Sequence, residues 1–594
     1  MINTTILKPG QENEIFLTPT YVAEEIVTVG GESAKCPVYV RKLPPCRNSC
    51  PSSEDIRGYL TTIAQAEMYK KPLEETLDEA WRVLTDKNPM PATHGRICPH
   101  PCEEGCNRQY KEDGSVAINN MERFIGDHGL KRGLKLFKLS DEKKKQRVAV
   151  IGSGPSGLSC AYQLARRGYQ VEIFEAFEKP GGMLRYGIPQ YRLPEEVLDK
   201  EIQNILDLGI KLKCGTRIGK DVDFKKLKKD YDAVYVAIGA HKGITLGVEG
   251  EDSANIFTAA SYLNRIKSGA KVEIGKKVLV IGGGDSAVDA ARTSLRLTED
   301  DPSKGAVDSA RVTKRIAASS DVTIVYRRTK NEMPAIKQDV EEAEREGIVF
   351  EFLTAPKEFI TKGGRATGLK CIRMELGKPD SSGRRRPVPI AGSEFTVEAD
   401  MIIVGIGQAP ELPGSLTEVG NEHGWVTADD FKETKLKGVF AGGDVLGLGI
   451  STKSVGDGRE AAERMDGYLR KVDYQRKPER TRPIKETELR LDFYAPEQRN
   501  EEKSLSPEAR IHGFEEINQT ITQEQAVAEA NRCMSCGLCF VCDQCRVFCP
   551  RDAISRDMKR PKGKTMFTDY TKCNGCHVCQ QACPSGYIQM GMGL

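Results

Sequence analysis

The chain has 594 residues, enough for about four domains of ordinary size. Lys and Arg number 88 against 85 Asp and Glu, and a net charge of +3 excludes a strongly basic nucleic-acid-binding protein and an acidic tail protein. No run approaches the roughly 18 apolar residues of a membrane span, and the N-terminus lacks the basic and apolar regions of a secretory signal.

Cysteine is the most informative residue type. Sixteen of the 19 cysteines fall in two blocks, residues 36–106 and 533–583, at C-x2-C, C-x3-C and similar short spacings. An odd number of cysteines at such short spacings does not indicate a set of disulfide bonds. A chain without a secretory signal is also expected in a reducing, cytoplasmic compartment, where disulfides are rare. The thiols are therefore expected to bind metal rather than to form cross-links.

The first block is expected to be a helical iron–sulfur domain. Residues 54–88 are predicted to be helical, since Leu73, Leu77, Trp81 and Leu84 recur on one face. Two histidines, His94 and His100, lie beside the thiols. Either is a conceivable ligand, but a loop histidine bonded to backbone is the favoured interpretation. The thiols of this block are Cys36, Cys46, Cys50, Cys98, Cys102 and Cys106.

A dinucleotide-binding fingerprint follows. The apolar strand from Arg147 runs into Gly152-x-Gly154-x-x-Gly157, then a helix, then a strand ending at Glu175. In this context the glycines let the backbone approach a pyrophosphate, and the acid is placed for a ribose hydroxyl. The pattern predicts FAD at residues that include Gly152, Ser153, Gly154, Ser156, Gly157 and Glu175.

The same strand–turn–helix pattern recurs from Lys277, where Gly282-x-Gly284-x-x-Ala287 opens a helix predicted over 286–297. The next strand, predicted over 321–328, ends in Arg327 and Arg328 instead of an acid, and arginine there accommodates a 2′-phosphate. The alternatives are that these arginines face solvent or pair with Glu341 or Glu342. We expect NADP(H), with NAD(H) as the alternative, at Gly282, Gly284, Asp285, Ser286, Ala287, Arg327 and Arg328. A polar insertion, 298–320, has no clear pattern.

A third segment, 438–444, is a predicted strand ending in Gly443-Asp444, before a helix predicted to start near Ser454. Such a segment returns to the FAD domain in two-dinucleotide flavoproteins and sets Asp444 near the ribityl chain. The FAD domain is therefore expected to be split around the NAD(P) domain. No C-x2-C lies between residues 107 and 532, so a disulfide-reductase mechanism lacks its cysteine pair.

The C-terminal block predicts an electron-transfer module. C-x2-C-x2-C-x3-C-P occurs twice, which is the run of two-cluster bacterial ferredoxins, where the fourth Cys of each run ligates the other cluster. One [4Fe-4S] cluster is assigned to Cys539, Cys542, Cys545 and Cys583, and the other to Cys573, Cys576, Cys579 and Cys549. The alternative is two structural zinc sites. The upstream pair Cys533 and Cys536 is not used by either run.

Residues 40–475 resemble the small subunit of NADPH-dependent glutamate synthase and its relatives, which include the N-terminal part of dihydropyrimidine dehydrogenase. The stretches that carry the resemblance are GRICPHPCEEGC, GGMLRYGIPQYRLPEEV, YRRTKNEMPA and AGGD. With its C-terminal ferredoxin module, the chain is similar to the iron–sulfur flavoproteins encoded with dissimilatory sulfite reductase. The resemblance implies hydride transfer between NAD(P)H and FAD, then single electrons through clusters to a partner. It also places Gly182, Leu184 and Arg192 at the flavin.

The resemblance further implies the N-terminal ligand sets. One cluster takes Cys50, Cys98, Cys102 and Glu122. The other takes Cys46 and Cys106 and lacks the pair that the family supplies from an N-terminal R-C-x-x-C. That motif stands here at Cys533 and Cys536, which are therefore predicted to reach back and complete the cluster. The alternatives are that Cys36 ligates or that the spare pair is merely buried.

The expected fold is multidomain α/β, with a helical iron–sulfur domain, two Rossmann-like domains and a bacterial-type ferredoxin α+β domain. We expect an NAD(P)H:acceptor oxidoreductase with FAD, four [4Fe-4S] clusters and a redox-protein partner, such as a ferredoxin or a partner reductase, in a homo-oligomer or hetero-complex. A relay subunit without its own turnover is the alternative. No catalytic side chain is nominated, because the cofactors carry the chemistry. The expected domains are 1–140 (iron–sulfur), 141–262 and 396–472 (FAD), 263–395 (NAD(P)), 473–530 (linker) and 531–594 (ferredoxin).

Overall fold

The computed structural model describes residues 36–297, 321–472 and 482–591. The predicted insertion 298–320 lies outside the described residues. The chain divides into two compact units: residues 1–137, 470–502 and 520–594 form the first, and residues 138–469 and 503–519 form the second. Each unit is described by itself.

The first unit contains a helical layer around the N-terminal cysteine loops. Helix α5 packs closely on α7, since a Cβ at Gly95 would lie 2.3 Å from the Arg123 nitrogen. On α4, Leu77, Trp81 and Leu84 are buried, as the periodicity predicts, while the fourth residue of the predicted face, Leu73, is only partly buried. Helix α17, from the far end of the sequence, contacts α3 and α7. The helices are α2 (Pro45–Ser49), α3 (Ile56–Ala64), α4 (Leu73–Thr85), α5 (Pro91–Ile97), α6 (Pro101–Glu104), α7 (Ile118–Arg132) and α17 (Gln523–Asn531).

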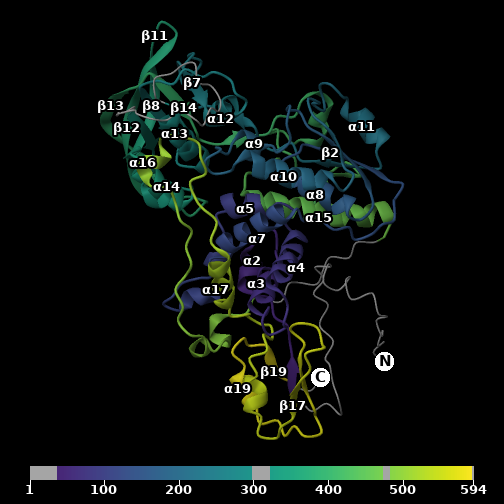
Figure 1. The fold of residues 1–594 in the computed structure, drawn as a ribbon. Coiled ribbons are helices and arrows are strands. Elements are labelled where there is room, and N and C mark those ends of the chain that lie inside the picture. Colours follow the sequence, from purple (N-terminus) through teal and green to yellow (C-terminus); the bar gives the residue numbers. More distant parts are fainter. Residues whose placement is uncertain (1–35, 298–320, 473–481, 592–594) are drawn as a thin grey trace. The chain divides into compact units, whose positions relative to one another are not determined.

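The same unit contains the ferredoxin module, drawn in yellow in Figure 1. It has two short helices, α18 (Gln544–Val547) and α19 (Val578–Ala582), and a hairpin of β17 (Ile554–Arg556) and β18 (Met566–Thr568). Its last strand, β19 (Ile588–Met590), pairs antiparallel with β1 (Pro37–Tyr39). The N-terminal segment thus supplies a strand to the C-terminal module, a pairing that no local sequence pattern indicates.

The second unit holds two parallel five-stranded sheets. The first has the order β16-β5-β2-β3-β4 and the second the order β10-β9-β8-β14-β7. Their central strands are apolar and buried, as expected for parallel sheets covered on both faces. The strands are β2 (Arg147–Ile151), β3 (Gln170–Phe174), β4 (Lys211–Lys213), β5 (Ala233–Val236) and β16 (Val439–Ala441), then β7 (Ile256–Thr258), β8 (Lys277–Ile281), β9 (Asp321–Tyr326), β10 (Val349–Phe352) and β14 (Met401–Val404).

Helices connect these strands. Helix α8 follows β2 and contacts β3, and α13 follows β8 and contacts β9. The sheet order puts β16, from the returning segment, beside β5 in the first sheet. The helices are α8 (Pro155–Ala165), α9 (Met183–Tyr186), α10 (Glu195–Leu206), α11 (Phe224–Asp230), α12 (Ala259–Lys267), α13 (Asp285–Leu297), α14 (Lys337–Arg345), α15 (Ser451–Arg470) and α16 (Pro507–Arg510).

Some elements differ from the sequence prediction. Strand β9 ends at Tyr326, so both arginines lie beyond it, and α15 starts at Ser451 rather than near Ser454. A three-stranded antiparallel sheet of β11 (Thr354–Lys362), β12 (Arg365–Pro379) and β13 (Arg385–Glu398) was not predicted. Two further strands, β6 (Lys242–Gly243) and β15 (Gln408–Ala409), form a short ladder. The predicted fold class is confirmed.

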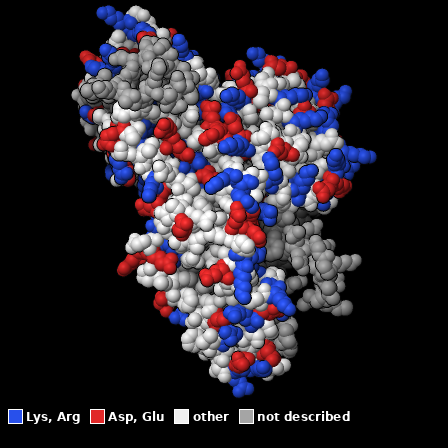
Figure 2. Space-filling view, viewed as in Figure 1, with Lys and Arg blue, Asp and Glu red and all other residues white. Residues whose placement is uncertain are grey.

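Within the described ranges, no helix combines the length and apolarity that would let it cross a bilayer. Figure 2 shows Lys and Arg interspersed with Asp and Glu on the visible face. This mixture agrees with the small net charge of +3.

Candidate cofactor and cluster sites

The first dinucleotide site lies where β2 turns into α8. Gly152 has a positive φ of 102°, and a Cβ there would lie 2.3 Å from the Ala237 carbonyl oxygen. A Cβ at Gly157 would lie 2.0 Å from the Gly152 oxygen. Around Gly154, by contrast, the nearest atom to an added Cβ is the Gly182 Cα at 4.0 Å. The turn therefore has no side chain over its centre, which fits the approach of a pyrophosphate.

Glu175 follows β3 and is buried. Its Oε2 accepts hydrogen bonds from the Ser153 nitrogen (2.9 Å) and hydroxyl, and its Oε1 accepts from the Phe177 nitrogen (2.9 Å). The Gly181 nitrogen in turn donates to the Ser153 Oγ at 3.2 Å. These bonds fix the carboxylate beside the glycine turn, and its contact with a ribose stays a prediction.

The returning segment brings Asp444 into the same unit. Gly443 donates its N–H to Asp457 Oδ2 at 3.1 Å, and Gly449 donates to Asp444 Oδ1 at 3.2 Å. Burial raises the pKa of Asp444 to about 6. A half-buried carboxyl at this position fits a hydrogen bond to a flavin hydroxyl, because such a partner would offset the cost of its partial burial.

Of the residues that the family resemblance places at the flavin, Gly182 and Leu184 flank the start of α9, and Leu184 is buried. Arg192 is held elsewhere by two carboxylates, Asp289 on α13 and Asp339 on α14, each at 2.9 Å. This guanidinium already has anionic partners. Its role at the flavin therefore stays a prediction that the geometry does not favour.

The second dinucleotide site lies where β8 turns into α13. Gly282 has a φ of 141°, and a Cβ there would lie 2.1 Å from the Gly405 oxygen, while an added Cβ at Gly284 meets nothing within 4 Å. Asp285 Oδ1 accepts a hydrogen bond from the Ile336 nitrogen at 2.9 Å. Ser286 and Ala287 lie in the first turn of α13, and Ala287 is fully buried. The second glycine turn thus has the same uncovered centre as the first.

The two arginines after β9 differ in their surroundings. Arg328 is buried; its Nη2 pairs with Asp380 at 2.7 Å and its Nε donates to the Arg385 carbonyl at 2.7 Å. Arg327 is exposed. Neither arrangement matches pairing with Glu341 or Glu342. Arg328 is committed to the β12–β13 turn, so Arg327 is the better candidate for a 2′-phosphate.

The structure brings Cys46, Cys106, Cys533 and Cys536 together. Burial raises the pKa of Cys46 well above its usual range, and the charges of Cys106, Cys533 and Cys536 raise it further. The pKa of Cys536 is also raised, mainly by burial and then by the charges of Cys106 and Cys533. Asn107 Nδ2 lies 3.9 Å from the Cys536 sulfur, and Arg57 Nη1 donates to the Cys536 carbonyl at 2.6 Å. Cys533 and Cys536, which were predicted to reach back, therefore lie next to Cys46 and Cys106, whose ligand set they were predicted to complete.

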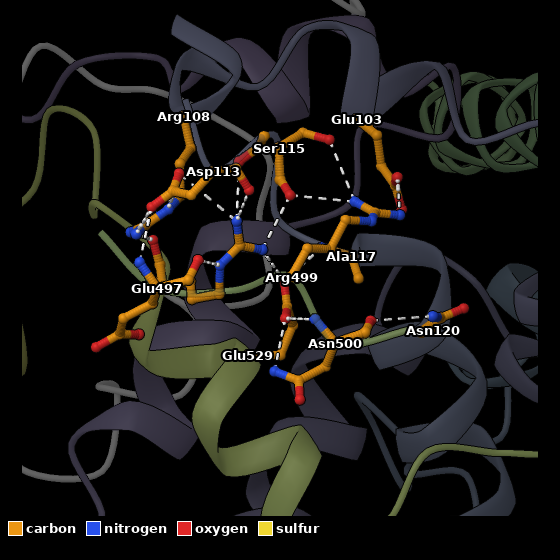
Figure 3. A network of polar contacts seen from close by, with 12 residues as sticks. Glu103, Arg108, Asp113, Ser115, Ala117, Asn120, Glu497, Arg499, Asn500 and Glu529 are labelled. Atoms are coloured by element: carbon orange, nitrogen blue, oxygen red, sulfur yellow. Dashed lines mark hydrogen bonds and ion pairs between the residues drawn. The ribbon is translucent and has the colours of Figure 1, made fainter. Parts of the chain in front are cut away.

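A buried polar network pins α17 in this position (Figure 3). Glu529 accepts from the Ala117 nitrogen at 2.6 Å and from the Asn500 nitrogen at 2.9 Å. Its other partner is Arg532, which donates to it at 2.5 Å. Arg108, two residues after Cys106, donates to the carbonyl of Arg532 at 2.6 Å. Since Cys533 follows Arg532, these bonds tie the backbones of the two cysteine segments together.

Arg532 is also held by the loop that precedes α7. Its guanidinium donates to the carbonyls of Asp113 (2.6 Å), Gly114 (2.9 Å) and Ser115 (3.0 Å). Arg499 donates to the Ser115 carbonyl at 3.1 Å and to Glu103 at 2.7 Å. The segment 470–502 thus adds to the polar network that holds α17 against the loop before α7.

The second N-terminal group consists of Cys50, Cys98, Cys102 and Glu122. The pKa of Cys102 is raised by burial and then by the charges of Cys50, Glu103, Cys98 and Glu122. On α7, Glu122 is buried, and its Oε1 accepts from Asn88 Nδ2 at 2.7 Å. This is the ligand set that the resemblance implies, with one oxygen donor among three sulfurs.

Neither histidine stands out as a ligand. His94 lies in α5 rather than in a loop, and its Nδ1 is 3.0 Å from the Met90 carbonyl and 2.9 Å from Asn88 Oδ1. Burial lowers its pKa to about 4, which keeps the ring neutral. The Nδ1 of His100 lies 2.9 Å from the Cys98 carbonyl. Both rings thus contact backbone, in line with the favoured interpretation.

The ferredoxin thiols fall into two groups that cross between the runs. The pKa of Cys545 is raised by burial and by the charges of Cys539, Cys583 and Cys542. That of Cys579 is raised to about 12 by burial and by Cys573, Cys576 and Cys549. A cavity is lined by Cys549, Cys573, Cys576 and Cys579 together. These groups match the two predicted ligand sets, in which the fourth cysteine of each run joins the first three cysteines of the other run.

One loop conformation recurs in every predicted cluster. Ser535, Val541, Gly575 and His100 all have positive φ, between 44° and 70°, and each lies two residues after a predicted ligand. In each case the backbone N–H donates toward the sulfur of that ligand: Cys533, Cys539, Cys573 and Cys98. Hydrogen bonds to cluster sulfurs tune the reduction potential. The Cys533–Cys536 loop therefore shares its backbone conformation with the ferredoxin loops.

Cys36 lies beside Cys573, whose pKa it raises, and its carbonyl accepts from Gly591 at 2.7 Å. The structure thus places Cys36 beside the ferredoxin thiols. This position does not favour the alternative prediction, in which Cys36 joins Cys46 and Cys106 as a cluster ligand. Within the described residues no group of three or more Cys, His, Asp or Glu is spaced for a single metal ion. The cluster assignments therefore rest on which thiols are neighbours.

Sequence reasoning missed the residues that lie between thiol groups. The pKa of Tyr494 is raised by burial and by the charges of Cys536 and Cys583, which belong to different predicted clusters. Its hydroxyl donates to the Met534 carbonyl at 2.8 Å, and its ring lies 6.0 Å from that of Phe540. Tyr39, on β1, similarly faces Cys545 and Cys579. Both come from segments without a cysteine motif, so no sequence signal identified them.

Three family models match the chain. Residues 138–465 match pyridine nucleotide-disulphide oxidoreductase, residues 19–134 match dihydropyrimidine dehydrogenase domain II, 4Fe-4S cluster, and residues 538–587 match a 4Fe-4S dicluster domain. The matched domains bring FAD, NADP(H) and [4Fe-4S] clusters as cofactors.

Curated relatives cover most of the chain. It is 35% identical to the NADP(+)-dependent formate dehydrogenase subunit beta of Moorella thermoacetica, over 83% of this chain and 70% of that protein. It is 34% identical to the NADPH-Fe(3+) oxidoreductase subunit beta of Geobacter sulfurreducens, over 83% and 75%. The small chain of glutamate synthase [NADPH] from Azospirillum brasilense is 33% identical over 72% and 87%. The chain therefore belongs to the pyridine nucleotide-disulphide oxidoreductase family, in its glutamate synthase small-chain-like group, and is an NAD(P)H-dependent iron–sulfur flavoprotein oxidoreductase.

Proposed function

We propose that the chain uses NADPH, one FAD and four [4Fe-4S] clusters, and that one cluster is built from both ends of the sequence. The observation that carries this proposal is the convergence of Cys46, Cys106, Cys533 and Cys536. A cluster shared in this way makes the ferredoxin module part of the N-terminal iron–sulfur domain, so electrons leave through it rather than through a detached tail.

When bound, the flavin exchanges a hydride with the nicotinamide and single electrons with the clusters. The chain's own residues provide binding and orientation. The uncovered turns at Gly154 and Gly284 receive the two pyrophosphates, Glu175 and Asp444 hold flavin hydroxyls, and Arg327 meets the 2′-phosphate. Burial of Cys50, Cys102, Cys545 and Cys579 limits the access of water to the clusters that they are proposed to bind.

The partner is proposed to be a redox protein in the same complex. Two relatives are named as beta subunits, of a formate dehydrogenase and of an NADPH-Fe(3+) oxidoreductase. The exposed Cys576 and the exposed Val547 and Phe548 beside Cys549 support the ferredoxin end as the place of electron exchange. A cytoplasmic location, a ferredoxin or reductase partner, and an association with sulfite reductase stay predictions of the sequence.

The first experiment supplies purified protein with NADPH and a viologen dye under anaerobic conditions. Turnover that requires both FAD and the clusters supports independent activity. Absence of turnover in a preparation with full flavin and iron would instead favour a relay subunit that works only in a complex.

The second experiment changes Cys533 and Cys536 to Ser and measures iron. We expect a loss of about four irons per chain, with the ferredoxin signals intact by electron paramagnetic resonance. Cys371→Ser is the control, because this thiol lies in the core of the second unit and is not a predicted ligand. Unchanged iron in the double variant would contradict the shared cluster.

A further inference from the structure

A surplus carboxylate lies at the group of Cys50, Cys98, Cys102 and Glu122. Glu54 is only 2% exposed, and both its charge and that of Glu122 act on the Cys50 thiol. The backbone N–H of Glu54 also donates toward the Cys50 sulfur. Four protein donors complete a [4Fe-4S] cluster, so Glu54 is a fifth donor at a site that needs four.

The two carboxylates are held differently. Asn88 donates from Nδ2 to Glu122 Oε1 at 2.7 Å, and its Oδ1 accepts from the Met90 nitrogen at 3.1 Å, which fixes the amide. The side chain of Asn88 also hydrogen-bonds Glu54, but Glu54 makes no ion pair within the described residues, and its buried Oε1 has no hydrogen-bond partner there. A buried carboxylate oxygen without a partner is costly, and iron is the cation that the surrounding thiols would bring to it.

A second buried polar atom at this place also lacks a partner. The Tyr59 hydroxyl, on α3, is fully buried and has no hydrogen-bond partner within the described residues. It faces the charges of Glu122, Glu54 and Cys102. A phenol there can donate to whichever carboxylate is not bound to iron.

We propose that Glu54 is a second oxygen ligand of this cluster, and that the iron not held by Cys50, Cys98 or Cys102 takes either Glu122 or Glu54. In the exchange one Fe–O bond breaks as the other forms, and no electron is gained or lost. Since the two carboxylates differ in their hydrogen bonds, the two ligations give the cluster different reduction potentials. The proposal rests on the proposed ligand set of this cluster.

The test compares Glu122→Ala, Glu54→Ala and the double variant by iron content, Mössbauer spectroscopy and electron paramagnetic resonance. We expect each single variant to keep its four-iron cluster, with Glu122→Ala shifting its potential. The double variant should lose about one iron per chain and show the signal of a three-iron cluster in the oxidised protein. The Leu variants at both positions, which preserve volume, repeat the test if the Ala variants do not fold.

Glu103→Gln is the control, because Glu103 also lies beside Cys102 but its two oxygens accept from Asn119 and Arg499. It should leave the cluster unchanged. A three-iron cluster in Glu122→Ala alone would overturn the role of Glu54, as would four irons retained in the double variant. A Cys98→Ser variant with normal iron and spectra would instead overturn the proposed ligand set itself.

Discussion

Removing the carboxylate of Glu529 should detach the C-terminal cysteine pair from the N-terminal thiols. Glu529 and Arg532 are both 0% exposed, and the pair they form carries the helix that leads directly into Cys533. In Glu529→Ala the guanidinium of Arg532 keeps its carbonyl partners and the more distant carboxylate of Asp113 (3.7 Å), but it loses its nearest carboxylate, which lies at 2.5 Å. We therefore expect lower stability together with loss of the shared cluster.

The magnitude follows from the contacts. Glu529 accepts four hydrogen bonds, from the nitrogens of Ala117 and Asn500, the side-chain amide of Asn500 and the guanidinium of Arg532. Breaking a buried ion pair by removing one partner costs about 3–5 kcal/mol. Backbone donors left unpaired at Ala117 and Asn500 put the value at the upper end of that range.

The assay combines thermal unfolding with iron content and electron paramagnetic resonance. Arg482→Ala is the control, because its ion pair with Glu488 has an arginine side chain that is 66% exposed, and a solvent-exposed ion pair contributes little to stability. Glu529→Ala should unfold at a clearly lower temperature and retain about four fewer irons. A variant that is destabilised yet keeps all its iron would refute the link between this network and the cluster.

The other predictions concern the flavin, the nucleotide and the electron path. Acid extraction should release one FAD per chain, and FMN or no flavin would contradict the first dinucleotide site. Arg327→Ala should raise the KM for NADPH about tenfold or more, with little effect on NADH, whereas Arg328→Ala should lower thermal stability instead. Equal effects of Arg327→Ala on both nucleotides would refute its phosphate role. Tyr494→Ala should slow reduction of the ferredoxin clusters by NADPH in stopped-flow measurements, and Tyr494→Phe should restore most of the rate; equal rates would show that the ring is only structural.

Much of the site could be predicted from short-range patterns. The Gly-rich turns follow from a need for backbone near a phosphate, and the structure gives them positive φ at Gly152 and Gly282. The ferredoxin groups follow from ligand spacing, because four thiols must surround one cluster. In both cases the chemistry acts on residues close together in sequence, so the pattern is visible without the fold.

Residues that act across long sequence distances could not be predicted. Glu54 is an acid in a loop until the fold buries it beside Glu122, and Tyr494 is one aromatic in a linker until it lies between two thiol groups. The ion pair between Arg328 and Asp380 could not be predicted either, because Asp380 belongs to a β-hairpin turn that carries no motif. Tertiary packing decides the partners of such residues, and periodicity contains no information about it.

The proposed shared cluster would take ligands from segments that lie far apart in the sequence. Cys106 and Cys533 are separated by most of the second unit, and closing so long a loop costs only about 3 kcal/mol more than closing a short one. The hydrogen bonds that Glu529 and Arg532 make to the N-terminal segment are expected to offset this cost, at a net contribution of about 0.5–1.5 kcal/mol each. An R-C-x-x-C element can therefore serve the same cluster from the far end of the sequence, provided that a helix and its polar anchor return it to the N-terminal thiols.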